Sequence, residues 1–221
     1  MRIIFFISLI ISVSQKIQSQ DNHQYLTKRP YAVVLGTTQD GGYPHAGCEK
    51  MCCKEAWLSD SLRKMVASIA IIDPRTGLAW MIDATPDFAK QYHIITKKHK
   101  ARLAGIFLTH AHIGHYSGLM QLGREVMGAK NVVVYAMPKM KKYLEKNGPW
   151  NQLVKLKNIK LSPIKDKEEV LLARDLIIEP FLVPHRDEFS ETVGYNVIGP
   201  NESMLYICLL YTSDAADDTD S

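Results

Sequence analysis

Residues 104–115 have the sequence AGIFLTHAHIGH, in which an apolar run is followed by three imidazoles within six residues. The apolar part predicts a buried strand over 104–109. Residues two apart in a strand point to the same side, so His110 and His112 can present neutral nitrogens to one metal ion while the chain turns to bring in His115. The spacing therefore predicts a metal site where a strand ends.

Three histidines can also be hydrogen-bonded polar groups at a strand end, or an exposed cluster without function. Here the H-x-H-x-x-H run is followed by a segment of helical character over 116–126. Imidazole is a common metal ligand, and this spacing after a strand favours the metal interpretation.

The segments on either side of this stretch predict an α/β protein. Strands are expected at 31–37, at 68–72 and 78–83 as a hairpin, and at 132–135, with helices at 86–98 and 138–146. From residue 159 onward the pattern is mostly β, with strands at 159–164, 169–173, 176–183, 192–198 and 204–207. Strands that first alternate with helices and then run together indicate an α/β sandwich around sheets rather than an all-β barrel.

Two further candidate site residues also end predicted strands. Asp83 closes the strand over 78–82, and His185 closes the strand over 177–184. Asp83 either supports the histidine loop or caps the helix that follows it. Asp187 and Glu188 are candidates for a proton shuttle or for side chains that contact the metal ligands without binding the metal. They are equally consistent with surface charges.

The segment 39–45 contains two adjacent glycines with Asp40 and His45 beside them. Glycines let the backbone approach a site closely, so this segment is either a loop at the metal edge or an ordinary tight turn.

Three cysteines lie close together in the sequence as C-x-x-x-C-C: Cys48, Cys52 and Cys53. The adjacent Cys52 and Cys53 cannot bond each other without strain, so export would favour a disulfide between Cys48 and one of them. A structural zinc site on these thiols is the alternative.

The beginning of the chain predicts export. Arg2 precedes an almost wholly apolar run over 3–13, and mostly polar residues follow, with the small Ser14 and Ser19 among them. This is the layout of a secretory signal peptide over 1–19, with a periplasmic or secreted mature protein; an uncleaved anchor is the alternative.

The end of the chain departs abruptly from strand-like sequence into the acidic tail CLLYTSDAADDTDS over 208–221. We interpret this tail as non-native, the translated read-through of a sequencing adapter, and expect one incomplete domain over 20–207. An ordinary disordered acidic terminus is the alternative.

The charge balance sets limits on the partners. The whole chain carries +4, and the tail contains four Asp and no basic residue, so residues 1–207 carry +8 and residues 20–207 carry +6. The lysines are spread along solvated faces, without the aromatic interleaving of a nucleic-acid site. We expect a small-molecule substrate, no nucleic acid and no stable membrane anchor.

The order of these motifs resembles the metallo-β-lactamase superfamily: a strand ending in Asp83, the loop 110–115, and a later strand ending in His185 followed by TVGY at 192–195. The segments GTTQDGGYPHAGC at 36–48, DATPD at 83–87 and PHRDEF at 184–189 are more narrowly similar to the branch of coenzyme PQQ synthesis protein B and its relatives.

The resemblance implies a four-layer αβ/βα sandwich, incomplete at its C-terminal end, with a zinc-type site of one or two ions, iron and manganese being alternatives. It assigns His110, His112 and His185 to a first metal and His115 to a second. The superfamily places Asp before its last loop histidine, whereas this chain has Gly114. The missing carboxylate favours a mononuclear or asymmetric site.

The functional prediction is a secreted metal-dependent hydrolase that activates water for attack on an ester, lactone, amide or phosphodiester, with Asp83 and Asp187 as the catalytic carboxylates. The alternatives are an iron-dependent oxidoreductase of PQQ-biosynthesis type and a non-catalytic metal-binding relative. The nature of the bound metal separates the first two.

Overall fold

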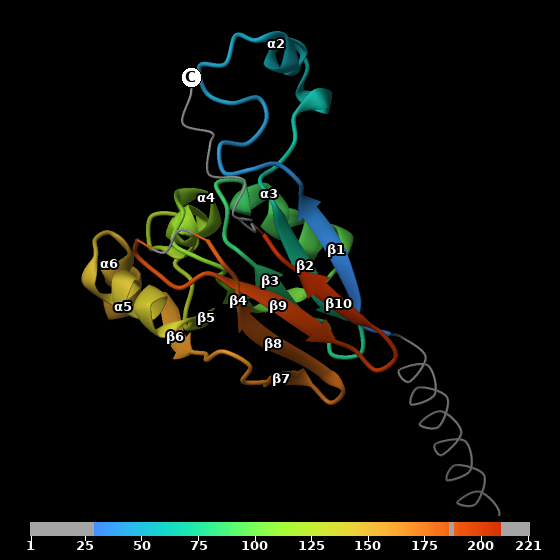
Figure 1. Ribbon diagram of the computed structural model, residues 1–221, viewed down its shortest axis with the longest axis vertical. Helices are drawn as coiled ribbons and strands as arrows, with labels where there is room; N and C mark the ends of the chain where they lie inside the picture. The colour runs from blue at the N-terminus through green and yellow to red at the C-terminus, as the bar shows by residue number, and fades with distance from the viewer. Residues whose placement is uncertain (1–28, 186–187, 209–221) are drawn as a thin grey trace, which may run out of the picture.

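The computed structural model describes residues 29–185 and 188–208, and it contains two β-sheets packed face to face (Figure 1). The larger sheet has the strand order β1 (Tyr31–Gly36), β2 (Ser68–Asp73), β3 (Leu78–Ile82), β4 (Arg102–Phe107), β5 (Val132–Ala136) and β6 (Ile159–Pro163). The smaller sheet has the order β10 (Ser203–Tyr206), β9 (Val193–Ile198), β8 (Leu176–Leu182) and β7 (Val170–Ala173).

The direction of the strands determines where their ends meet. Strands β1, β2 and β3 pair antiparallel, whereas β3 to β6 pair parallel to one another. Parallel neighbours have their carboxyl ends at the same edge of the sheet, which is where α/β proteins place their sites. The loops after β3 and β4 therefore lie side by side.

The core is divided by the larger sheet. Strand β2 is buried along its whole length, with Ile69 and Ile71 in the cluster between the sheets and Ala70 and Ile72 in the cluster under the helices. Because successive side chains alternate between faces, a strand covered on both sides has a continuous apolar sequence. Tyr195 on β9 is the largest fully buried side chain between the two sheets.

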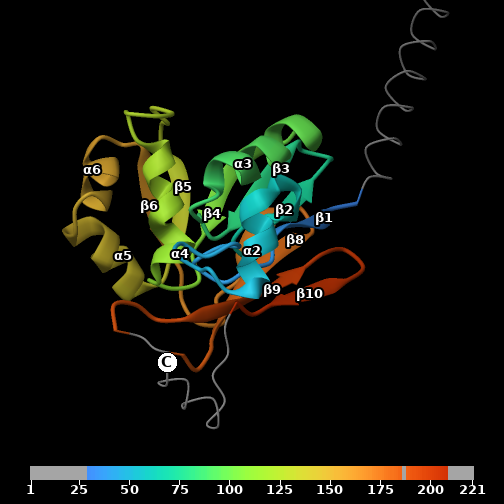
Figure 2. The same cartoon turned by 90° about the horizontal axis from the view of Figure 1, so that it is seen from above.

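Helices cover the face of the larger sheet that points away from the smaller one (Figure 2). They are α3 (Phe88–His93) with the π-helical turn η2 (Ile94–Lys98), α4 (Ile113–Tyr116), the 3₁₀ turn η3 (Ser117–Leu122), α5 (Pro138–Lys146) and α6 (Trp150–Lys155). The layers of the described residues are thus helix, sheet and sheet.

The resemblance implied a fourth layer, of helices outside the smaller sheet, and residues 29–185 and 188–208 contain none there. Leu171 on β7 and Leu205 on β10 are correspondingly exposed, at 68% and 62%. The expected signal peptide over 1–19 and the tail from residue 209 lie outside the described residues, and both remain predictions.

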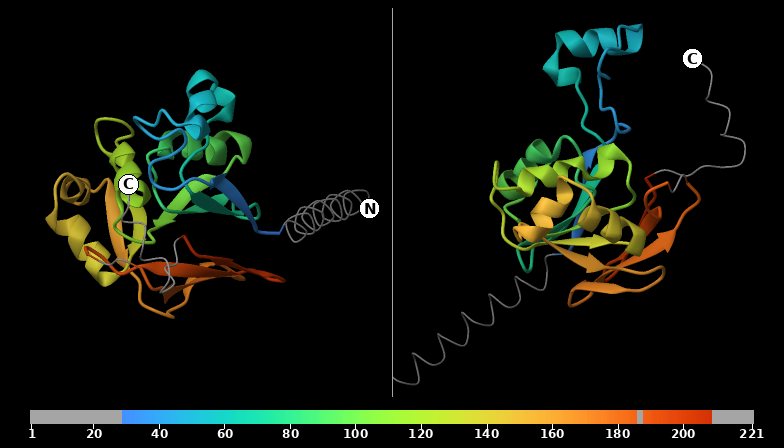
Figure 3. Two further views of the ribbon diagram at one scale, coloured as in Figure 1. Left: turned by 45° about the horizontal axis from the view of Figure 1, so that its top comes forward. Right: turned by 90° about the vertical axis from the view of Figure 1, so that its left-hand side faces the viewer.

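A segment between β1 and β2 stands above the sheet edge and carries α2 (Met51–Leu58) and the 3₁₀ turn η1 (Asp60–Leu62) (Figure 3). The sequence pattern did not predict α2, η1 or α6. Apart from the segment 116–126, the predicted strands and helices are present, with ends shifted by at most two residues.

One predicted helix is different. The segment 116–126 forms the end of α4 and the 3₁₀ turn η3 rather than one α-helix. The amide of Gly118 donates a hydrogen bond to the carbonyl of Ala84 at 2.8 Å, and a Cβ on Gly118 would lie 2.1 Å from the Thr85 carbonyl oxygen. This close backbone approach to the loop after β3 overrides the helical pattern.

Candidate metal centre

The predicted histidines converge at the carboxyl edge of the larger sheet. His110, His112 and His115 follow β4, and His185 follows β8 of the other sheet. Two hydrogen bonds join the sheets at this point: the Val193 amide donates to the Thr109 carbonyl at 3.0 Å, and the Tyr195 hydroxyl donates to the Leu108 carbonyl at 2.6 Å. The two histidine loops are therefore held against each other by the core.

Three imidazole nitrogens face one another. His110 Nε2 lies 2.9 Å from His112 Nδ1, and His185 Nε2 lies 3.2 Å from the same atom. All three ligand atoms lie within 4.8 Å of one another. Nitrogens on one tetrahedral ion with bonds of about 2.1 Å are about 3.4 Å apart, so the donor set fits a metal ion.

Outer contacts orient these rings. His110 Nδ1 lies 2.8 Å from the Thr109 hydroxyl, and His112 Nε2 lies 3.7 Å from the half-exposed Glu188 carboxylate. Burial and the neighbouring imidazoles lower the pKa of His110 to about 2, which keeps it in the neutral form that a metal needs. Asp187 lies outside the described residues, so its predicted role remains untested.

Asp83 supports the histidine loop. Its carboxylate is fully buried, accepts hydrogen bonds from the Thr109 amide at 2.8 Å and the Thr109 hydroxyl, and lies 2.8 Å from His115 Nδ1. It caps no helix, because Asp87 holds the N-cap position of α3. The backbone of Asp83 has a φ of 67°, and these contacts hold that strained conformation in place. This geometry favours a positioning role over the predicted catalytic one.

The other ring nitrogen of His115 faces a second carboxylate, on the loop after β1. His115 Nε2 lies 2.9 Å from Asp40 Oδ1. The hydrogen bond to His115 lowers the pKa of Asp40 to about 2. Burial opposes the charged form of His115, but the Asp83 charge and the contacts with Asp40 and Asp83 raise its pKa to about 12. The segment 39–45 is therefore a loop at the metal edge.

Gly114 is packed directly against this loop. A Cβ at position 114 would lie 2.6 Å from the Asp40 Cα and 2.7 Å from the Asp40 Cβ. The sequence predicted that Gly114 leaves the loop without a carboxylate, and the structure places the side chain of Asp40 beside this position. Only the adjacent glycines of the loop indicated a close approach in the sequence.

Cys208, two residues after the end of β10, also lies at the site. Its sulfur is 3.7 Å from each ring nitrogen of His115, and it forms a possible ligand group with Asp83 and His115. The sequence interpretation assigned Cys208 to the non-native tail. The structure nevertheless brings this position to His115.

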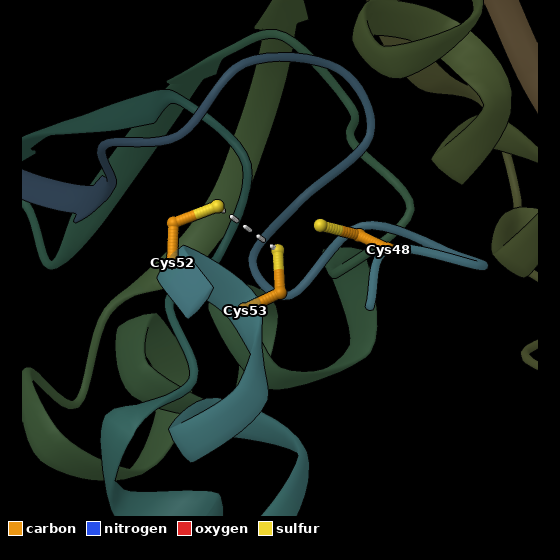
Figure 4. A group of neighbouring side chains, drawn as sticks. All are labelled: Cys48, Cys52 and Cys53. Carbon is orange, nitrogen blue, oxygen red and sulfur yellow. Dashed lines mark hydrogen bonds between the residues drawn. The ribbon is translucent and has the colours of Figure 1, made fainter. Parts of the chain in front are cut away.

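The cysteine cluster lies apart, on the loop before α2 and on the helix itself. Figure 4 shows the three sulfur atoms directed toward one another, and all lie within 4.8 Å. Cys48, Cys52 and Cys53 are free thiols, which differs from the predicted disulfide. Cys52 Sγ and Cys53 Sγ are 3.9 Å apart, close to the roughly 3.8 Å between thiolates that share one zinc ion with bonds of about 2.3 Å.

Asp40 also lines a cavity of about 440 Å³ between its loop and the segment that carries α2. Tyr43, Trp57, Arg63 and Lys90 contribute to the walls. Asp40 is thus accessible from the cavity on one side and contacts His115 on the other.

A family model for the beta-lactamase superfamily domain matches residues 80–215, more than half of the chain. The chain belongs to the beta-lactamase superfamily. Its curated relatives place it near the PqqB branch, since coenzyme PQQ synthesis protein B of Xanthomonas campestris is 28% identical over 184 residues, which are 78% of this chain and 59% of that protein. The protein of the same name from Methylobacterium sp. is 29% identical over 98 residues, 41% of this chain and 33% of the relative.

Solved structures of this superfamily share the fold. Zinc-bound PqqB from Methylobacterium extorquens superposes with a TM-score of 0.68 at 22% identity, covering 83% of this chain and 67% of that one. A diphosphatase of the PhnP family superposes with a TM-score of 0.57 at 24% identity, covering 76% and 62%. The chain thus spans about a third to two thirds of the length of these proteins.

Proposed function

We propose that this protein is a metal-dependent hydrolase whose first metal ion is held by His110, His112 and His185. The observation that carries the proposal is the convergence of the three imidazole nitrogens, two from one sheet and one from the other, at separations suited to one ion. A superfamily that includes hydrolases on the same fold supports it.

When bound, a zinc-type ion supplies Lewis acidity and lowers the pKa of a water molecule toward neutrality. The side chains of the protein position the ligands. Thr109 orients His110, and Asp83 orients His115 from a fully buried position. Because the ligands are fixed by strand ends and by hydrogen bonds, little reorganisation is needed when a substrate binds.

Glu188 is the described group best placed to move a proton. Its carboxylate lies 3.7 Å from His112 Nε2, and half of its side chain is exposed to solvent. It can therefore exchange protons with water while remaining beside the ligand cluster. We extend the same role to Asp187 as a proposal.

The substrate that we propose is a small ester, lactone, amide or phosphodiester that reaches the site beside Asp40. The cavity next to Asp40 has the volume of a small-molecule pocket, and its walls carry both basic and acidic side chains: Arg63, Lys64 and Lys90 beside Asp40, Asp60 and Asp87.

A panel of chromogenic esters, lactones, amides and phosphodiesters tests this function on the full chain reconstituted with Zn²⁺ or Mn²⁺. We expect turnover of one class, lost in a His110→Ala variant that remains folded. No turnover of any class by metal-loaded protein would overturn the hydrolase proposal and favour a non-catalytic relative.

A second candidate function comes from the curated relatives, whose names assign them to PQQ synthesis. The same histidines would then hold iron in an oxidoreductase. Reconstitution with Fe²⁺ without oxygen, followed by exposure to oxygen, distinguishes the two functions: oxygen consumption that depends on His110 favours the oxidoreductase, and its absence together with hydrolytic turnover favours the hydrolase.

We also propose that the protein is exported and acts in the periplasm or outside the cell, from the apolar run over 3–13. The structure bears on this only in that none of its described helices is long and apolar enough to cross a bilayer. Mass spectrometry of protein from intact cells tests it: a mature N-terminus near residue 20 supports export, and a chain that still begins at Met1 contradicts it.

A further inference from the structure

We propose that Asp40 supplies the carboxylate of a second metal position, together with His115, and that Gly114 is glycine because any side chain there would displace Asp40. This inference rests on the proposed function, since it adds a second ion beside the first. Of the mononuclear and asymmetric sites that the sequence of the histidine loop suggested, it favours the asymmetric one.

One ring nitrogen of His115 is available to a metal, and the other is not. Its Nδ1 lies 2.8 Å from the buried carboxylate of Asp83, so that nitrogen is already engaged. Nε2 is the nitrogen that faces Asp40. A ligating histidine usually has one ring nitrogen on a buried carboxylate and the other on the ion, and His115 has this arrangement.

The distance between His115 Nε2 and Asp40 Oδ1 suits two ligands of one ion. His115 Nε2 and Asp40 Oδ1 are 2.9 Å apart, and two donors bonded to one ion at about 2.1 Å are about 3.0 to 3.4 Å apart. The ring centroid of His115 lies 4.4 Å from that of His110, so an ion on His115 and Asp40 would adjoin the first ion. The 1% exposure of the His115 side chain excludes bulk water from its side of the pair.

Asp40 occupies the space that a side chain at position 114 would need. Gly114 lies on α4 with its Cα facing the backbone of Asp40, and an added Cβ would approach the Asp40 Cα to 2.6 Å and its Cγ to 2.8 Å. Real Cβ atoms are not found so close to backbone atoms, so an alanine at 114 must push the Asp40 loop away from His115. The carboxylate at 40 and the glycine at 114 therefore form one unit: the same volume cannot contain both Asp40 and a side chain from 114.

The experiment measures metal binding rather than turnover. Full-length wild-type protein and the variants Asp40→Asn, Gly114→Ala and the double variant are titrated with Zn²⁺ and Mn²⁺ by calorimetry, and bound metal is counted by mass spectrometry. We expect two ions at the histidine edge of the wild-type chain, in addition to any ion that the cysteine cluster holds and Cys48→Ser removes. Asp40→Asn and Gly114→Ala should each weaken the second ion by about 10- to 100-fold while the first is retained.

The double variant is the decisive comparison. If Gly114 acts through Asp40, combining the two substitutions weakens the second ion no further than either alone. Asp60→Asn is the control for loss of a carboxylate in this region, because Asp60 is exposed and paired with Arg63, and it should leave both ions unchanged. A rescue variant that exchanges the two residues, Asp40→Gly with Gly114→Asp, should recover part of the second-ion affinity.

Ions are counted at the histidine edge, after subtracting any ion that Cys48→Ser removes. Three results would overturn the inference: a single ion there in the wild type with an affinity that Asp40→Asn leaves unchanged, two ions there that both survive Asp40→Asn, or effects that add fully in the double variant while circular dichroism shows all proteins folded. One ion there with hydrolytic turnover would leave the hydrolase proposal intact. No ion there in the wild type would overturn both.

Discussion

The two metal-ligand clusters of this molecule are built in opposite ways. The histidine cluster joins residues 73 to 75 positions apart in the chain, at the ends of strands from two sheets, and its His110 and His115 are almost fully buried. The cysteine cluster joins residues within one short segment around α2, and Cys52 is exposed there.

The two clusters differ in whether the fold positions the ligands or the ligands stabilise the fold. At the histidine cluster, the sheets and the hydrogen bonds of Thr109 and Asp83 place the ligands, so the site is preformed by the fold. Around α2 only Cys53 and Ala56 are buried within the helix, so a cross-link or a metal is needed to stabilise the segment. We therefore expect loss of a histidine to cost function and loss of a cysteine to cost local stability.

The largest expected effect separates the clusters by activity. His185→Ala removes one of three ligands of the first ion, and both metal affinity and turnover should fall by about 10³-fold or more, because each remaining imidazole alone binds weakly. Cys48→Ser should change turnover by less than about threefold at 25 °C. Metal titrations and initial rates of both variants measure the contrast. Equal losses of turnover would show that the clusters are not functionally distinct.

A smaller effect is expected from Asp83→Asn. Asparagine tolerates the positive φ at this position and retains an oxygen for the Thr109 amide, so the substitution mainly removes the charge opposite His115. Metal affinity should fall by about 10- to 100-fold, with little change in fold. Direct attack or proton transfer by Asp83 would instead abolish turnover while metal affinity is unchanged, and that outcome would restore its predicted catalytic role.

The cysteine cluster should contribute to stability through a bound ion. We expect purified, reduced protein to carry one ion that Cys48→Ser removes, and the unfolding temperature of that variant to fall by a few degrees, at about 2–4 °C per kcal/mol for a chain of this size. Calorimetry with and without added Zn²⁺ measures this. Non-reducing mass spectrometry that finds a Cys48 disulfide would contradict it and confirm the pairing expected from the sequence.

The smallest effect concerns the hydrogen bond that joins the two sheets behind the site. Tyr195→Phe removes the donor to the Leu108 carbonyl from a fully buried position and should cost about 1 kcal/mol, or about 2–4 °C. Tyr135→Phe is the matched control, because Tyr135 stacks on Phe107 through its ring and should lose little. If both variants unfold at the wild-type temperature, the hydrogen bond does not help to hold the sheets together.

Much of this arrangement could be predicted from the sequence. Alternating and continuous apolar runs located the strands, because these signals depend on local periodicity and on residue type. The H-x-H-x-x-H loop and the strand end at His185 located the candidate ligands, and the resemblance to the metallo-β-lactamase superfamily assigned them to metal positions. Asp83 could be placed at a strand end, but its role could not be decided, since capping and support of a histidine use the same carboxylate.

The parts that could not be predicted depend on contacts distant in the sequence. Nothing local shows that Asp40 meets His115, 75 positions away, or that Gly114 is small because Asp40 occupies its space. The 3₁₀ turn over 117–122 likewise follows from the close packing of the Gly118 backbone against the loop after β3. In each case tertiary packing overrides a pattern that is clear locally.

We propose that His110, His112 and His185 hold one metal ion between the two sheets. The metal content of purified full-length protein beside a His110→Ala/His185→Ala double variant, counted by mass spectrometry after dialysis against dilute Zn²⁺, tests this directly. We expect the first-ion binding of the wild type to be lost in the double variant while circular dichroism shows the fold intact. A folded double variant with the full metal content of the wild type would contradict it.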